Sequence, residues 1–262
     1  RWRRRWPMAA GGPEACSWIW PKSRWRRATA GRVAYPRGGR STCRGVDRTA
    51  ATAAGAGKRA PASKKKAALG FVNEDFYDAD GKFIVEKGKD SIVRLCEYHG
   101  YPLFDGFRED LWVSDYGVGE FTKLGLAAYM FVNNEEDRYM MLDLMLLPGQ
   151  MLPEHWHVEG GGNPVKREGW LVRWGLAHIV GIGEPNLSPE VVIPKCHCGG
   201  TATTKHAVIA RPGTFVKLAK VQSRHWQYGG PEGAIVTEVA NVHTGSAVRH
   251  SDPAINKYFL EG

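Results

Sequence analysis

Residues 149–175 constrain this chain more than any other stretch, because they space two histidines and a carboxylate as a metal site requires. The stretch reads GQMLPEHWHVEGGGNPVKREGWLVRWG and contains His155, His157 and Glu168, and a third imidazole, His225, follows far downstream. Side chains two residues apart on a β-strand face the same side, so both histidines can point inward while the residue between them points outward. Two imidazoles and a carboxylate suit a first-row divalent ion, with positions left open for substrate oxygens.

Strand and turn signals on both sides of this stretch predict an all-β domain. Strands are predicted at residues 111–113, 124–132, 139–147, 168–174 and 175–183, in a short run from 215, and at 234–242. Pro148-Gly149 and Pro212-Gly213 each begin a strand-turn-strand block that contains one or two of the candidate histidine ligands. Two such blocks predict a small closed antiparallel barrel with a jelly-roll path, and barrels of this kind can hold one small ligand.

A short helical region precedes the strands. Residues 90–99 predict a helix with Asp90 as its N-cap and Gly100 as its stop. The buried face of this helix is expected to consist of Ile92, Val93, Leu95 and Cys96.

The positive charge of the chain is concentrated in its first 66 residues. They carry 18 Lys and Arg side chains against Glu14 and Asp47, whereas residues 67–262 carry 18 basic and 25 acidic side chains. We expect residues 1–66 to form a basic, low-complexity, disordered arm, and residues 67–262 to form the folded domain. The mildly acidic domain is not expected to bind nucleic acid, although tryptophans of the arm could stack on single strands.

The arm itself leaves three interpretations open. It is Arg-rich and acid-poor, as a transit peptide is, but it lacks the apolar region of a secretory signal. A disordered tail is the second interpretation, and upstream sequence read in frame with the true start is the third. The first residue, Arg1, and the first methionine, Met8, favour the third.

Cysteine usage and hydropathy indicate a reducing compartment and no membrane span. The five cysteines have irregular spacing and form no disulfide framework. No run of about 18 apolar residues is present in the sequence. We therefore expect a cytoplasmic protein that has no membrane partner.

Two further charged residues, Glu238 and Lys166, share the inner face predicted for the ligands. Glu168 alternates with Trp170, Val172 and Trp174, and Glu238 alternates in the same way with Ala234, Val236, Ala240 and Val242. A buried carboxylate that is not needed as a ligand can act as a general base, because burial raises its pKa. A fifth ligand or a structural carboxylate is the alternative for Glu238. Lys166 has the parity of Glu168 and could reach a substrate oxygen, or it could be an exposed loop lysine.

The Cys196-His197-Cys198 motif offers a second candidate metal site. Structural zinc sites usually draw on two well-separated ligand pairs, and only His206 follows nearby. We therefore favour a flexible polar insertion at residues 195–205. The remaining histidines are expected to be structural, although His250 and Asp252 could lie near the barrel mouth; they are His99, His178, His243 and His250.

Together these motifs resemble the cupin superfamily. The pattern that carries the resemblance is Gly149-x5-His155-x-His157-x10-Glu168-x6-Gly175, followed by Pro212-Gly213 and His225. Further motifs resemble the cupin-type D-lyxose ketol-isomerases, namely DYG at 115–117, PGQ at 148–150, PEHWH at 153–157, Lys166-x-Glu168, His225-Trp226, GAIVTEV from Gly233 and SDPAI at 251–255. The resemblance covers roughly residues 108–256. The insertion at 195–205 departs from the shorter family members.

The resemblance implies a metal-dependent aldose-ketose isomerase that interconverts D-lyxose with D-xylulose and D-mannose with D-fructose. Its metal, usually Mn²⁺ with Co²⁺, Fe²⁺ or Zn²⁺ as alternatives, would be held by His155, His157, Glu168 and His225. Glu238 is the expected base that moves a proton between C2 and C1, and a hydride shift is the alternative. Cupins of this kind are often dimers, so a homodimer is expected by analogy.

Two other functions stay open at this point. An iron cupin oxygenase would use the same three histidines and one glutamate, and a non-catalytic cupin would bind the sugar without turnover. Neither has an evident need for a buried base at Glu238, so this residue favours the isomerase.

Overall fold

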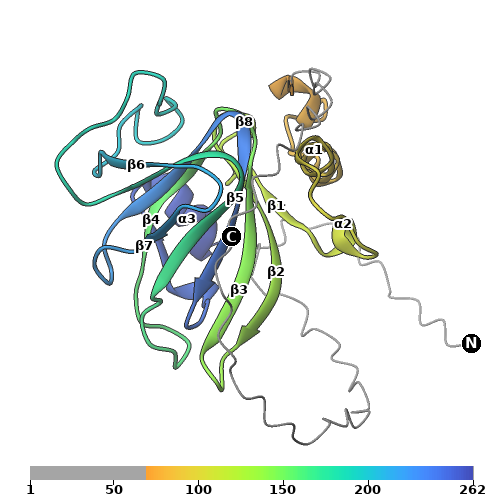
Figure 1. Ribbon diagram of the computed structural model, residues 1–262. Helices are drawn as coiled ribbons and strands as arrows, with labels where there is room; N and C mark the ends of the chain where they lie inside the picture. The colour runs from red at the N-terminus through yellow and green to blue at the C-terminus, as the bar shows by residue number, and fades with distance from the viewer. Residues whose placement is uncertain (1–68, 262) are drawn as a thin grey trace, which may run out of the picture. The chain divides into compact units, whose positions relative to one another are not determined.

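The computed structural model describes residues 69–261, and the arm predicted over residues 1–66 lies outside them. Strands dominate the described part (Figure 1). They are, in chain order, β1 Trp112–Ser114, β2 Leu126–Asn134, β3 Tyr139–Leu146, β4 Met151–His157, β5 Glu168–Gly181, β6 His206–Ala210, β7 Phe215–Lys217, β8 His225–Ala240 and β9 Val248–His250. The helices are η1 Asn73–Phe76, α1 Val85–His99, α2 Phe107–Asp110, η2 Gly245–Ala247 and α3 Pro253–Glu261. The prediction of an all-β fold with a short helical region before the strands is confirmed.

The strands form one antiparallel sheet that curls around its own inner face (Figure 1). The strand order is β1-β2-β3-β8-β4-β9, and β5 pairs with β6, β7 and β8. The first half of β8 pairs with β4 and its second half pairs with β3, while β5 follows both halves. The curl encloses apolar side chains from β2, β3, β4, β5 and β8, and Ile255 of α3 packs against them. The barrel-like antiparallel architecture expected of a cupin is therefore present.

A second core packs α1 against the outer face of the sheet. Ile92, Leu95 and Cys96 of α1 are fully buried, in a cluster with Met145 of β3 and Ile235 of β8. Complete burial of an aliphatic side chain stabilises a fold by about 1.5–3 kcal/mol relative to leaving it exposed. The helical region is thereby held on the outer face, on the side of the sheet opposite the predicted ligands.

Helix α1 begins earlier than the sequence predicted, at Val85 rather than after an Asp90 cap. Gly88 explains the difference, because a Cβ at this buried position would come within 2.9 Å of two neighbouring side chains. The missing side chain therefore allows the first turns to pack closely. Asp90 accepts a hydrogen bond from Arg108 Nε at 2.9 Å and does not cap the helix. The predicted stop is confirmed, since Gly100 forms a left-handed C-cap with a φ of 71°.

Strand β5 is one bent strand where two were predicted. Its pairing with β8 slips between Val172 and Trp174 and again beyond Gly175. The first slip turns Trp174 to the outer core, whereas strict alternation from Glu168 predicted this side chain on the inner face. The slip lies beyond Val172, so the inward direction of Glu168 is unaffected.

Gly175 is required where β5 bends. Its φ is +73°, and a Cβ there would lie 2.1 Å from the carbonyl oxygen of Gly233 on β8. We expect Gly175→Ala to lower the free energy of unfolding in urea by about 2–4 kcal/mol, because backbone strain and steric overlap add. Gly81→Ala is the matched control, since its φ is +77° but no described atom lies within 4 Å of the added Cβ. Equal losses in the two variants would contradict the role of the overlap.

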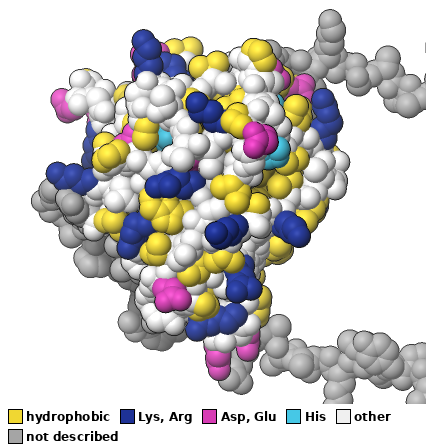
Figure 2. Space-filling view, turned by 90° about the vertical axis from the view of Figure 1, so that its left-hand side faces the viewer, with side chains coloured by type: hydrophobic (Ala, Val, Ile, Leu, Met, Phe, Trp, Pro, Cys, Tyr) yellow, Lys and Arg dark blue, Asp and Glu magenta, His cyan; other side chains and the backbone are white. Residues whose placement is uncertain are grey.

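The face on which β6 lies carries dispersed charges. Figure 2 shows its Lys and Arg side chains separated by hydrophobic and uncharged ones, without one continuous basic patch on this face. Within residues 69–261, no helix has the length and apolar character needed to cross a membrane.

Candidate metal and catalytic site

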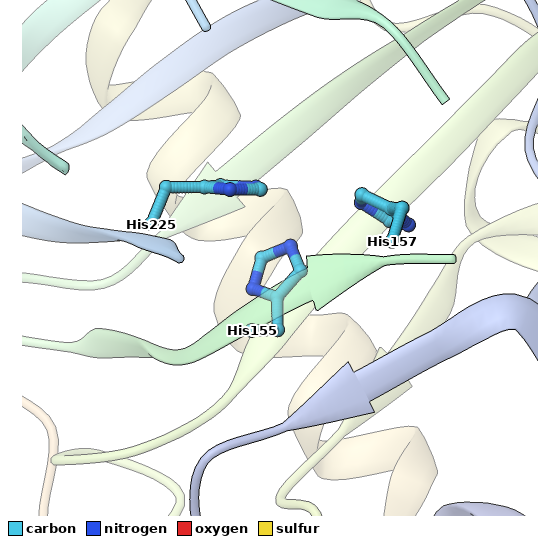
Figure 3. A group of neighbouring side chains, drawn as sticks. All are labelled: His155, His157 and His225. Carbon is cyan, nitrogen blue, oxygen red and sulfur yellow. The ribbon is translucent and has the colours of Figure 1, made fainter. Parts of the chain in front are cut away.

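Three histidines from two paired strands converge on the inner face of the sheet (Figure 3). His155 and His157 come from β4 and His225 comes from the start of β8. One ring nitrogen of each histidine lies within 4.8 Å of those of the other two. Their exposed fractions are 8%, 3% and 2%, respectively. The register pairs His155 directly with His225. The two-residue spacing on β4 turns both of its histidines to one side, as the sequence predicted. A surface loop position for His225 is excluded.

Backbone carbonyls orient two of the three rings. Nδ1 of His155 donates to the carbonyl of Pro153 at 2.8 Å, and Nδ1 of His225 donates to the carbonyl of Ser223 at 3.0 Å. A carbonyl only accepts hydrogen bonds, and burial lowers the pKa of both imidazoles, so each neutral ring presents a bare Nε2 to the cluster. Contacts of this kind typically fix the tautomer and orientation of metal-ligating imidazoles.

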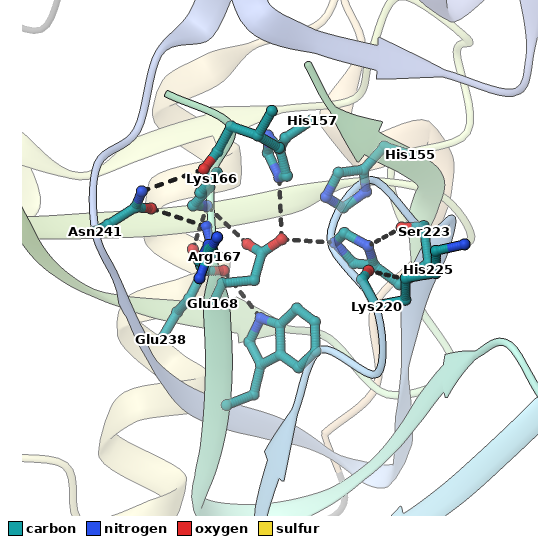
Figure 4. A network of polar contacts seen from close by, with 12 residues as sticks. His155, His157, Lys166, Arg167, Glu168, Lys220, Ser223, His225, Glu238 and Asn241 are labelled. Atoms are coloured by element: carbon teal, nitrogen blue, oxygen red, sulfur yellow. Dashed lines mark hydrogen bonds and ion pairs between the residues drawn. The ribbon is translucent and has the colours of Figure 1, made fainter. Parts of the chain in front are cut away.

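Glu168 brings a carboxylate into the same cluster from the first residue of β5 (Figure 4). Its Oε1 lies 3.3 Å from Nε2 of His157 and 3.3 Å from Nε2 of His225. Burial alone would raise the pKa of Glu168, but the charge of Lys166 and the neighbouring imidazoles hold it well below its usual range. Neutral imidazoles and an ionised carboxylate are the protonation states that ligate a divalent ion.

Several buried atoms of the cluster have no hydrogen-bond partner among residues 69–261. The ones that face each other are Nε2 of His157, Nε2 of His225 and Oε1 of Glu168. A buried polar group without a hydrogen bond costs about 1–3 kcal/mol, and more when it is charged. Coordination of one cation would satisfy these three facing atoms together, so the residues fit a divalent metal ion.

Lys166 connects this cluster to a second buried carboxylate, Glu238 (Figure 4). Its Nζ lies 2.9 Å from Oε2 of Glu168 and forms an ion pair with Oε1 of Glu238. Nε1 of Trp170 donates to the other Glu238 oxygen, Oε2, at 3.0 Å. Lys166 is 5% exposed. An exposed loop lysine, the alternative interpretation of Lys166, is therefore wrong. Glu168 and Glu238 both lie on the inner face, as the sequence predicted.

The two carboxylates differ in their affinity for protons. Burial raises the pKa of Glu238, Lys166 opposes that shift, and the negative charge of Glu168 adds to it. Burial would lower the pKa of Lys166, but the two carboxylates raise it, so the amine stays charged. Titratable pairs whose surroundings push their pKa values apart are typical of acid-base sites.

Two further histidines lie beside the cluster: His243, which was expected to be structural, and His250, for which a position near the barrel mouth was the alternative. His250 on β9 pairs with His155 across the edge of β4, with 5.8 Å between the ring centroids. The ring of His243 lies 6.3 Å from that of His157. Strand β9 has only three residues and His243 belongs to no strand. The alternation of side chains along a strand could therefore not predict the direction of either histidine. Only the closure of the sheet brings them to the site.

The Cys196-His197-Cys198 segment forms no second metal cluster within residues 69–261. His197 is completely buried, its Nδ1 donates to the carbonyl of Thr201 at 2.8 Å, and its Nε2 accepts the backbone N–H of Glu154 at 3.2 Å. Both ring nitrogens are therefore occupied. The expectation of a flexible insertion is wrong for His197, which packs against β4.

The chain is similar in sequence to known sugar isomerases, although no family model matches it. The D-lyxose ketol-isomerase of Cohnella laeviribosi is 31% identical over 173 residues, which are 65% of this chain and 92% of that protein. The D-lyxose/D-mannose isomerase of Thermosediminibacter oceani is 32% identical over 152 residues, which are 57% of this chain and 81% of that protein. Among solved structures, the L-ribose isomerase of Cellulomonas parahominis has 14% identity and a TM-score of 0.49, over 70% of this chain and 96% of that one.

Proposed function

The chain belongs to the D-lyxose ketol-isomerase family, and from that membership we propose that it converts D-lyxose to D-xylulose. We propose D-mannose, which gives D-fructose, as a second substrate, because one relative is named for both aldoses. The observation that carries an aldose-ketose isomerase reaction is the link, through Lys166, between the histidine-glutamate cluster and the second buried carboxylate, Glu238.

His155, His157, Glu168 and His225 are the proposed ligands of a divalent metal ion. The bare Nε2 atoms, the ionised carboxylate and the buried atoms without hydrogen bonds support this assignment. Mn²⁺ is the proposed ion, and Co²⁺, Fe²⁺ and Zn²⁺ are the alternatives, because a set of nitrogen and oxygen donors accepts each of them. When bound, the ion supplies Lewis-acid polarisation of the carbonyl and hydroxyl groups of the sugar.

Glu238 is the proposed base that removes the proton from C2 of the aldose and returns it to C1. Its raised pKa suits both steps, because the same group must first accept the proton and then release it. Trp170 and Lys166 each hold one of its oxygens, so the carboxylate is oriented before the sugar binds. Lys166 is the proposed donor of a hydrogen bond to a substrate oxygen, whose growing negative charge its ammonium group would stabilise.

An oxygenase and a non-catalytic sugar-binding protein would share the histidine cluster. Neither explains a second buried carboxylate with a raised pKa, and the relatives reported above are named as isomerases. The isomerase therefore has the stronger support.

The direct test is an activity screen of the full chain after removal of metal with EDTA. D-lyxose, D-mannose, D-xylose and L-ribose are each supplied with Mn²⁺, Co²⁺, Fe²⁺ or Zn²⁺, and ketose formation is measured. Turnover of D-lyxose with Mn²⁺ is the expected result. Absence of turnover with every pair of sugar and metal would refute the proposed function. It would favour the oxygenase or the non-catalytic sugar-binding protein instead.

Lys166→Met is expected to move the acidic limb of the kcat-pH profile to higher pH. The lysine charge lowers the pKa of Glu238, so its removal keeps this carboxyl protonated, and inactive as a base, up to a higher pH. Lys123→Met is the matched control, because Lys123 pairs with Glu120 and its side chain is 62% exposed. An acidic limb that stays in place in Lys166→Met would show that Glu238 is not the titrating base.

Four further proposals concern the organisation and location of the whole chain. We propose a basic arm over residues 1–66, a folded domain over residues 67–262, a homodimer, and a cytoplasmic location without a nucleic-acid partner for the domain. Light scattering during size-exclusion chromatography tests the dimer, since a monomer mass at working concentration would refute it.

A further inference from the structure

A bulge in β4 decides which way its histidines point. Leu152 belongs to the inner core. Between Leu152 and His155, β4 advances by three residues while its partner β8 advances by two. Strict alternation from Leu152 would turn Glu154 inward and His155 outward. The extra residue reverses this phase, so that His155 and His157 both reach the inner face.

Glu154, inside the bulge, has a completely buried side chain that is bound by two other segments. Its Oε1 accepts hydrogen bonds from the backbone N–H of Thr204 at 2.7 Å and from the Thr204 hydroxyl at 2.8 Å. Its Oε2 accepts from the N–H of Thr203 at 3.1 Å and from the hydroxyl of Ser251 at 2.6 Å. The carboxylate therefore joins β4 to the insertion at residues 195–205 and to the residue that follows β9.

The backbone of Glu154 is held by the same two segments. Its N–H donates to Nε2 of His197 at 3.2 Å, and its carbonyl accepts from the N–H of Ser251 at 3.0 Å. The bond from Ser251 extends the antiparallel register of β4 and β9 by one residue, and the bond to His197 holds the neighbouring N–H of Glu154. The bond from Nδ1 of His197 to the carbonyl of Thr201 holds the ring with its Nε2 directed at Glu154.

The insertion is also tied to the C-terminal helix. Oδ2 of Asp252 accepts the N–H of Cys198 at 2.6 Å, while Oδ1 accepts the N–H of Ala254 at 2.9 Å, at the start of α3. The segment that carries His197 is thus anchored at a second point, independent of β4.

We propose that Glu154 and His197 are positioning residues for the metal ligands His155 and His157, because they hold the bulge that turns both imidazoles inward. Protein hydrogen bonds occupy both ring nitrogens of His197 and both carboxylate oxygens of Glu154, so neither side chain is proposed as a ligand. The insertion at residues 195–205 is a brace for β4, which gives the Cys196-His197-Cys198 motif a role without a metal of its own. This inference rests on the metal-binding part of the proposed function.

The test measures Mn²⁺ affinity of the EDTA-stripped full chain, from the electron paramagnetic resonance signal of free Mn²⁺. Near-ultraviolet circular dichroism establishes that each variant is folded. His197→Ala removes the acceptor for the Glu154 N–H, and Glu154→Gln places an amide donor against N–H donors. We expect each to weaken Mn²⁺ binding by about 10- to 100-fold, as loss of a contact that supports a metal ligand typically does. His197→Gln, whose amide oxygen can take the place of Nε2, is expected to restore most of the affinity.

His178→Gln is the matched control. His178 is 2% exposed, as buried as the ligands, but it lies on β5, which pairs with β6, β7 and β8. We expect this variant to lose stability while it keeps its Mn²⁺ affinity. Folded His197→Ala and Glu154→Gln proteins that bind Mn²⁺ as tightly as the wild type would overturn the proposal, as would an equal loss in His178→Gln. If His197→Ala does not fold, Glu154→Gln and His197→Gln decide the question.

The outcome separates this proposal from the proposed reaction. Wild-type protein that binds Mn²⁺ without converting any aldose refutes the reaction, while weakened binding in the His197 and Glu154 variants still supports the positioning role. Wild-type protein that binds none of Mn²⁺, Co²⁺, Fe²⁺ and Zn²⁺ refutes both.

Discussion

Glu238→Gln is expected to lower kcat for D-lyxose by about 10²- to 10⁴-fold, the range that a general base contributes. Glutamine has almost the same volume and can still accept the hydrogen bond from Trp170, but it cannot take up the C2 proton. Mn²⁺ affinity and the circular dichroism spectrum are expected to stay close to those of the wild type. The measurement combines steady-state kinetics with Mn²⁺ titration on the same preparation.

Asp143→Asn is the control for the loss of a buried carboxylate. Asp143 accepts hydrogen bonds from Tyr101 at 2.9 Å and Thr237 at 2.6 Å, on the outer face of the sheet. Its replacement is expected to lower stability and leave kcat near the wild-type value. Full activity of Glu238→Gln would remove Glu238 from the mechanism, and simultaneous loss of Mn²⁺ would assign this residue as a further ligand.

Removal of metal with EDTA is expected to abolish turnover and to lower Tm, with both restored by Mn²⁺. A ligand that binds only the folded state stabilises it by about 2.7 kcal/mol when its concentration is 100 times Kd. The buried ligand atoms without hydrogen bonds add a reason for the loss of stability, because the metal-free protein must leave them unsatisfied or hydrate them. Differential scanning calorimetry with and without Mn²⁺ measures the shift.

His155→Ala is expected to reproduce the metal-free state permanently. It removes one of three convergent imidazoles, so neither stoichiometric Mn²⁺ nor turnover should remain. His206→Ala is the control, because His206 lies on β6 with Nδ1 bonded to the carbonyl of Glu184. A His155→Ala protein that kept both metal and activity would show that the histidine cluster is not the metal site.

Local periodicity explains why the core of the site could be predicted. The i, i+2 relation of His155 and His157 holds on any strand, whatever residues pair with that strand. Alternation with apolar neighbours likewise placed Glu168 and Glu238 on the inner face. Alternation failed at Trp174, where an extra residue in β5 reverses the phase; the glycine that follows, Gly175, marks the bend but does not show which residue is added.

The sequence by itself determined the all-β class, the ligand candidates and the relative direction of neighbouring side chains, because each depends on residues close together in the chain. The tertiary structure alone decided the absolute phase of β4, the burial of Lys166 between two carboxylates, and the approach of His243 and His250 to the site. These depend on pairing between segments far apart in sequence. The contacts of His197 with Glu154 are of the same kind, since residues more than forty positions apart meet only when the sheet closes.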